Sequence, residues 1–133
     1  MDDNAPMPIT VVPHDIPNQV MAVVTGEIAV GEMMAFVKAS RIGERRSWAF
    51  ILDTSGAAVA ASSADLQNIA DFAAEEFKKS AIGPVAFVSS DPGTFGMGRV
   101  YQAYSSASGR SNVGVFKTLD DAQRWLSRIK VGF

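Results

Sequence analysis

Residues 48–77 read WAFILDTSGAAVAASSADLQNIADFAAEEF, and this stretch decides the fold. Its first part, Trp48 to Leu52, is almost wholly apolar, as expected for a strand that is covered on both faces of a sheet. An acidic turn, Asp53 to Gly56, is predicted to end that strand. A small-residue stretch then leads to Ser62 and Ser63 at the start of an amphipathic helix. A strand followed by a turn and a helix is the repeating unit of α/β sheets.

The two adjacent serines are the first candidates for a functional site. Ser62 and Asp65 have the spacing of a capping box, in which each side chain binds the backbone N–H of the other residue. On this interpretation Ser62 is the N-cap and Ser63 is only the first exposed residue of the helix. Alternatively, Ser63 accepts a phosphate, which the helix dipole would favour and Asp65 would oppose. A third interpretation joins both serines to Asp53 in a docking surface.

The composition is that of one folded domain. The chain has 133 residues, 47% of them hydrophobic, and we expect a loose tail over residues 1–7 and a single domain over 8–133. A net charge of −2 gives no general attraction to nucleic acid or to anionic membranes. Without cysteine, disulfides and thiolate chemistry are excluded. Because neither a signal peptide nor a membrane span is found in the sequence, we expect a cytoplasmic protein.

Apolar periodicity predicts the order β-β-α-β-α-β-α-β-α. The first two strands are joined by a short loop and are expected to be antiparallel. The later strands alternate with helices, which predicts parallel strands joined by right-handed crossovers. The predicted class is therefore α/β, with a mostly parallel sheet and an antiparallel N-terminal strand. Strands are predicted at 9–12, 19–25, 48–52, 85–88 and 113–116, and helices at 30–42, 62–77, 91–107 and 118–129.

A glycine-rich segment follows the fourth predicted strand. Residues 89–99 read SSDPGTFGMGR and lack the Gly-Lys-Ser/Thr ending of a nucleotide-binding P-loop. Gly96 and Gly98 instead fall in the opening turns of a helix, where each lowers helix stability by up to about 1 kcal/mol relative to alanine. We therefore expect them to permit close packing or access of a ligand. Arg99 either binds an anion or bonds to a neighbouring carboxylate or carbonyl group.

Other polar residues give weaker signals. His14 is the only histidine, and no G-x-S-x-G motif accompanies it, so neither a Ser-His-Asp hydrolase nor a multi-histidine metal site is indicated. Arg41, Arg45 and Arg46 form a small basic cluster that Glu44 interrupts. We interpret this cluster as part of a solvated loop, because an acidic chain with so few basic residues together is not typical of a nucleic-acid binder.

The element order and the serine segment resemble the STAS domain, the fold of bacterial anti-sigma factor antagonists and of sulphate-transporter tails. In that family a strand leads through Asp-Ser-Ser-Gly-Leu into a helix, and an anti-sigma kinase phosphorylates the second serine. The matching residues here are Ala61-Ser62-Ser63-Ala64, with alanines in place of the acid and the glycine, and with Leu66 one place late. Residues 23–28 (VVTGEI) are similar to the family's early strand, in which a Gly-Glu pair precedes the first helix.

The C-terminal half is more similar to a bacterial SpoIIAA-like branch, the STAS/CRAL-TRIO-type proteins of unknown function. This resemblance lies in residues 95–99 (FGMGR) and 115–126 (VFKTLDDAQRWL). Together the two likenesses cover nearly all of the chain beyond residue 8. They imply a sheet with most of its helices on one face, and an incompletely covered sheet would favour self-association into a homodimer.

These observations favour a non-enzymatic STAS-like module that engages a protein partner or itself, with no cofactor, metal, nucleic acid or membrane span. The alternative is a domain that binds a small apolar molecule or a lipid in a pocket near residues 95–101. The docking residues would be Asp53, Thr54, Ser62, Ser63, Leu66 and Arg99, with Ser63 as the phosphoacceptor. The pocket of the alternative would be lined by Met33, Met34, Phe36, Phe95, Met97 and Tyr101, the last three of which would otherwise form a dimer contact.

Overall fold

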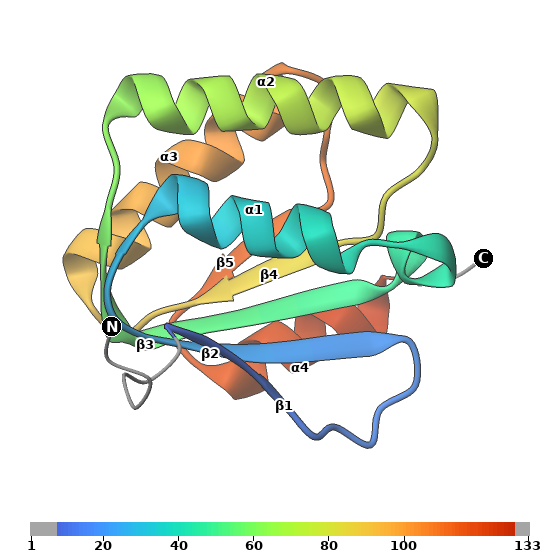
Figure 1. The fold of residues 1–133 in the computed structure, drawn as a ribbon, viewed down its shortest axis with the longest axis horizontal. Helices are drawn as coiled ribbons and strands as arrows, with labels where there is room; N and C mark the ends of the chain where they lie inside the picture. Colours follow the sequence, from blue (N-terminus) through green and yellow to red (C-terminus); the bar gives the residue numbers. More distant parts are fainter. Residues whose placement is uncertain (1–7, 130–133) are drawn as a thin grey trace, which may run out of the picture.

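Five strands form one mixed sheet in chain order, with the first strand antiparallel to the second and the remaining pairs parallel (Figure 1). The α/β class and the antiparallel first strand are therefore confirmed. The computed structural model describes residues 8–129, so the tail predicted at 1–7 lies outside the described residues. The strands are β1 (Ile9–Val12), β2 (Gln19–Ala29), β3 (Ala49–Ala60), β4 (Val85–Val88) and β5 (Val113–Phe116).

Helices cover both faces of this sheet unequally (Figure 1). One face carries α1 (Val30–Ser40), α2 (Ser63–Lys79) and α3 (Pro92–Ala107), whereas the other carries only α4 (Leu119–Arg128). The four helices follow the strands in the predicted order. Because crossovers between neighbouring parallel strands put successive helices on the same side, α1, α2 and α3 lie together and form the larger core.

The strands supply two cores because successive side chains point to opposite faces. In β3, Phe50 and Leu52 pack with the α1–α3 side, and Ile51 packs with Leu126 of α4. All three β3 side chains are fully buried. The apolar run that predicted a strand covered on both faces is thereby confirmed.

Strands β2 and β3 are longer than the sequence predicts. β3 continues through Asp53 to Gly56, so the turn predicted there is wrong. A shift in register between Val23 and Thr25 of β2 accommodates this polar stretch as an irregularity in the ladder. Beyond it, Ala57 and Val59 pack against the core, while Ala58 and Ala60 are exposed. This period of two is what a half-buried strand requires, and it keeps β3 extended.

Side-chain caps begin the later helices where they were predicted. Ser62 accepts a hydrogen bond from the backbone N–H of Asp65, and the Asp65 carboxylate accepts one from Ser62, which confirms the capping box. Asp91 caps α3 and Thr118 caps α4 through the same kind of bond. Each such cap contributes about 1 kcal/mol to the stability of its helix.

The end of α1 differs from the prediction. The helix stops at Ser40, and Gly43 then adopts a φ of +61°, a conformation that side-chain-bearing residues rarely take. The chain continues as the 3₁₀ helix η1 (Gly43–Ser47). This segment was predicted to be a solvated loop, and Gly43 to Arg45 and Ser47 are exposed. Arg41, grouped with it in that prediction, instead binds backbone carbonyl groups and lies at the candidate site described below.

Candidate functional site

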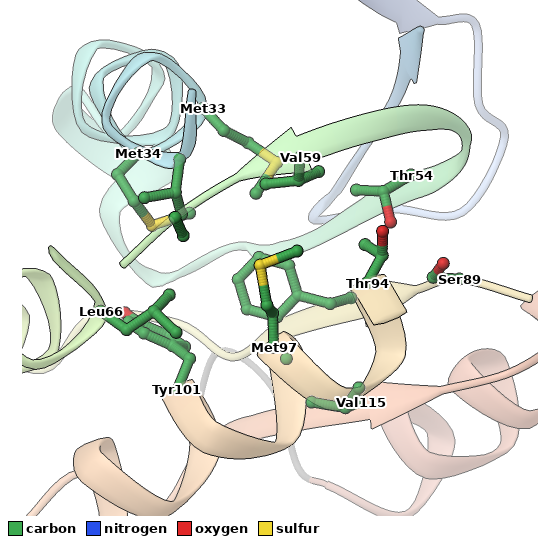
Figure 2. A pocket seen from close by; sticks show the side chains of 14 residues that line it. Met33, Met34, Thr54, Val59, Leu66, Ser89, Thr94, Met97, Tyr101 and Val115 are labelled. Atoms are coloured by element: carbon green, nitrogen blue, oxygen red, sulfur yellow. The ribbon is translucent and has the colours of Figure 1, made fainter. Parts of the chain in front are cut away.

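The pocket predicted from the apolar residues exists as a small cavity between α1, α3 and the sheet (Figure 2). Its volume is about 30 Å³, enough for about one water molecule but not for an organic ligand. Met33, Met34, Met97 and Tyr101 line it as predicted, with Leu66 of α2 and Val115 of β5 among the other lining residues (Figure 2). These flexible thioethers fill most of the space, so the residues chosen from the sequence serve mainly as core.

Two of the predicted lining residues lie elsewhere. Phe36 and Phe95 pack against the core but do not line this cavity. Lys117 Nζ lies 5.4 Å from the centroid of the Phe95 ring, which gives that ring a surface partner. Gly98 does line the cavity, and a Cβ there would lie 2.8 Å from Val115 Cγ1. The close packing expected of Gly98 is confirmed, whereas close packing does not explain Gly96, where a Cβ would have nothing within 4 Å.

The predicted docking surface does not form one continuous face. Asp53 pairs in register with Val88, which packs with α4, so Asp53 belongs to the α4 face of the sheet. Ser62 and Ser63 begin α2 on the opposite face. Thr54 is buried and donates a hydrogen bond to the Val88 carbonyl oxygen at 2.8 Å. Asp53 accepts a local bond from the Ser55 backbone N–H.

The remaining docking candidates differ in exposure. Ser63 is exposed, and its Oγ lies 2.6 Å from the hydroxyl oxygen of Tyr104 in α3. Leu66 is only 5% exposed and packs in the core, so its side chain is not available to a partner. Arg99 is exposed and lines a shallow hollow of α3 with Gln102.

A hollow much larger than the methionine-lined cavity lies between α1 and α2, and the sequence did not predict it. Its volume is about 470 Å³, which falls in the range of sites for small organic molecules. α2 packs more extensively against α3 than against α1, which leaves this space above the sheet. We call it the α1–α2 groove. Its apolar lining includes Met34, Val37, Ile69, Phe72, Ala73, Ile82, Val85, Phe87 and Tyr101.

Polar contacts join the two helices across the groove. Lys38 Nζ of α1 lies 4.6 Å from the centroid of the Phe72 ring of α2, a ring that remains 49% exposed. Nη2 of Arg46, from η1, lies 3.9 Å from Oε2 of Glu76. Glu76 is the one carboxylate residue that lines the groove. The first contact joins α1 to α2 and the second joins η1 to α2; both bring partly exposed side chains together, so they hold these elements only weakly.

Arg41 lies at the inner end of the groove and binds backbone carbonyl groups. Its Nη1 donates to the carbonyl oxygens of Arg46 and Trp48, both at 2.9 Å. Its Nη2 donates to those of Gly83 at 2.9 Å and Pro84 at 3.4 Å. These bonds connect η1, the start of β3 and the segment before β4. Its guanidinium also lies 4.4 Å from the Phe50 ring centroid. Arg41 is therefore a structural clamp.

Arg110 lies beside Arg41 and shares one of its partners. Its Nη2 donates to the same Gly83 carbonyl oxygen at 3.3 Å, and its Nε donates to Asn112 Oδ1 at 2.8 Å. The residue is only 4% exposed. Two guanidinium groups are thus held at one oxygen atom in a largely buried place. In residues 8–129, no carboxylate forms an ion pair with either of them.

Burial changes the acidity of both groups. Burial, followed by repulsion from Arg110 and Arg46, lowers the pKa of Arg41 to about 9. Burial also lowers the pKa of Arg110, and the Tyr101 hydroxyl opposes that change. At neutral pH Arg41 therefore still carries its positive charge.

Sequence reasoning placed Arg41 in a solvated loop and did not single out Arg110. A signal for Arg41 was present, because it lies four residues after Val37 and continues the apolar stripe of α1. No local sequence pattern predicts that Arg110 is buried, because its burial results from packing of the loop after α3 against Gly83. The groove itself depends on how far α1 and α2 diverge, which is a property of the assembled fold.

Comparison with known proteins gives no assignment. No protein-family model matches the chain, and no curated protein matches it either. Among the described residues, no group of three His, Asp or Glu side chains is placed to hold a metal ion. No helix between residues 8 and 129 has the length and apolar character to cross a membrane. The α1–α2 groove has the size and the mostly apolar lining of a binding site.

Proposed function

We propose that this protein is a non-enzymatic, STAS-like binding module that takes a small apolar or amphipathic molecule into the α1–α2 groove. The observation that carries the proposal is the volume of about 470 Å³ between two helices that lie apart over an apolar floor. The element order with an antiparallel first strand supports the STAS-like class. This proposal follows the ligand-binding alternative from the sequence but moves the site from the methionine-lined cavity to the groove.

A neutral fluorescent probe tests groove binding without any contribution from charge. N-phenyl-1-naphthylamine, whose emission rises in apolar surroundings, is expected to bind the wild-type protein. Ala73→Trp places an indole in the groove and is expected to weaken probe binding at least about tenfold, which corresponds to about 1.4 kcal/mol. Ala64→Trp is the matched control, because Ala64 is exposed on the same helix and does not line the groove. Absence of probe binding, or equal binding by both variants, would overturn the proposal.

A protein-docking function is the second candidate, centred on Ser62 and Ser63. The exposed contact between Ser63 and Tyr104 supports it, because it joins the start of α2 to α3 in one surface. Asp53 and Leu66 are not part of this narrower surface. Pull-down from a native lysate is expected to recover a stoichiometric partner that Ser63→Glu releases. Recovery that is unaffected by Ser63→Glu, or no recovery, would contradict this function.

A further inference from the structure

The groove is positively charged in a protein that is acidic overall. Four basic side chains line it against the single carboxylate of Glu76, whereas the whole chain has a net charge of −2. Charge of one sign in a hollow with apolar walls attracts ligands of the opposite sign, because the walls concentrate the field. The basic residues are Lys38, Arg41, Arg46 and Arg110.

Of the four basic side chains, only Arg46 has an acidic partner among residues 8–129. Lys38 of α1 contacts the Phe72 ring, and Arg46 of η1 lies beside Glu76. Arg41 and Arg110 converge on the Gly83 carbonyl oxygen instead. Two like charges held together in a largely buried place repel each other, and an anion beside them would relieve that repulsion.

The two arginines are not equally free to bind a ligand. Both Nη atoms of Arg41 already donate to backbone carbonyl groups, four in all. The bonds of Arg110 to Gly83 and Asn112 use its Nη2 and Nε. In the described residues, no hydrogen bond to a carbonyl or carboxylate occupies Nη1 of Arg110, and the neighbouring polar group is the Tyr101 hydroxyl. Arg110 can therefore donate to an incoming anion that binds beside the Tyr101 hydroxyl or displaces it, with Arg41 adding its charge from nearby.

The geometry points to a single-chain carboxylic acid as the ligand of the α1–α2 groove, with its carboxylate at Arg110 and its hydrocarbon chain along the apolar walls. A guanidinium group binds a carboxylate through short, charge-assisted hydrogen bonds. The volume of about 470 Å³ suits one hydrocarbon chain. The inference rests on the proposed groove-binding function and adds the chemistry of the head group.

Decanoate and 1-decanol test the head group on the unmodified protein. The two probes share a chain of equal length and differ in charge, so calorimetric titration of the wild-type protein at neutral pH compares them directly. We expect decanoate to bind at least about tenfold more tightly than 1-decanol, because charge-assisted hydrogen bonds are about twice as strong as neutral ones. Equal affinities would overturn the carboxylate inference and leave the groove function intact. If neither probe binds, nor N-phenyl-1-naphthylamine, the groove function itself fails and the carboxylate inference with it.

The variant Arg110→Met tests whether the preference for decanoate over 1-decanol depends on Arg110. We expect this variant to bind decanoate about tenfold more weakly and 1-decanol within about twofold of wild type, since a methionine keeps much of the volume and removes the charge. Arg128→Met is the matched control, because Arg128 is exposed on α4 at the other face of the sheet and its loss changes the net charge equally. Unchanged decanoate binding by Arg110→Met would overturn the assignment. If Arg110→Met does not fold, the ratio of decanoate to 1-decanol affinity in the wild-type protein decides whether the groove prefers a carboxylate.

Discussion

The methionine-lined cavity and the α1–α2 groove share walls but differ more than tenfold in volume. Met34, Phe87 and Tyr101 line both hollows, which therefore lie next to each other on the α1–α3 side of the sheet. In the cavity, flexible side chains from two helices meet and leave about 30 Å³. In the groove, α1 and α2 meet only through weak edge contacts and leave about 470 Å³. Apolar residues alone therefore do not make a binding site. The helices that carry them must also lie far enough apart to leave space for a ligand.

The largest expected effect comes from the clamp at the inner end of the groove. Arg41→Met removes one donor from each of four carbonyl groups, of which those of Gly83 and Pro84 belong to buried residues and keep a second donor. We expect the free energy of unfolding to fall by about 4 kcal/mol, because each of the four hydrogen bonds lost contributes about 1 kcal/mol. Urea denaturation measures this change. Arg45→Met is the control: Arg45 is exposed in η1 and should change stability by less than about 1 kcal/mol. Similar losses in both variants would mean that Arg41 is not a clamp.

The next prediction compares the walls of the two hollows. Met33 lines the methionine-lined cavity and is 4% exposed, so Met33→Ala should lower the free energy of unfolding by about 3 kcal/mol. Val37 lines the open groove and is half-buried, so Val37→Ala should lower it by about 1 kcal/mol. Thermal and urea unfolding of both variants give the difference. A larger loss for Val37→Ala would show that the groove is closed and packed in solution.

Two glycines of α3 test how closely this helix packs beside the methionine-lined cavity. A Cβ on Gly98 would press on Val115 Cγ1, so Gly98→Ala should destabilise the protein by about 1–2 kcal/mol. Gly96 has nothing within 4 Å of the same position, so Gly96→Ala should stabilise it by up to about 1 kcal/mol through helix propensity. The midpoints of urea unfolding report both changes. Equal effects in the two variants would mean that α3 is not pressed against β5 at Gly98.

The smallest expected effect concerns the contact that spans the groove. Loss of the Lys38–Phe72 contact through Phe72→Ala should lower stability by about 0.5 kcal/mol, because the ring is half exposed. Lys38→Met should lower it by a similar amount, and the double variant by less than the sum of the two. A double-mutant cycle by urea unfolding measures this coupling. Strict additivity would show that the two side chains do not hold α1 and α2 together.

The fold was largely predictable from the sequence, because its signals are local. Caps such as Ser62 and Asp91 and the apolar run at Trp48 to Leu52 depend on neighbours within a few residues. The polar stretch from Asp53 to Gly56 misled the prediction because its strand is held by pairing with β2, a contact distant in sequence. The groove and the burial of Arg110 depend on tertiary packing in the same way. Local patterns therefore gave the elements, and the site arose from how those elements meet.

Gly83 limits which sequence changes this protein can tolerate. A Cβ at this residue would overlap the Trp48 carbonyl oxygen, so any other residue requires the starts of β3 and β4 to move apart. The carbonyl group of the same residue receives both Arg41 and Arg110. Substitution of Gly83 would therefore disturb folding together with the proposed ligand selectivity of the groove. A saturation screen at residue 83 should yield only variants that keep both properties or lose both, so the proposed head-group preference cannot change at this position without a loss of folding.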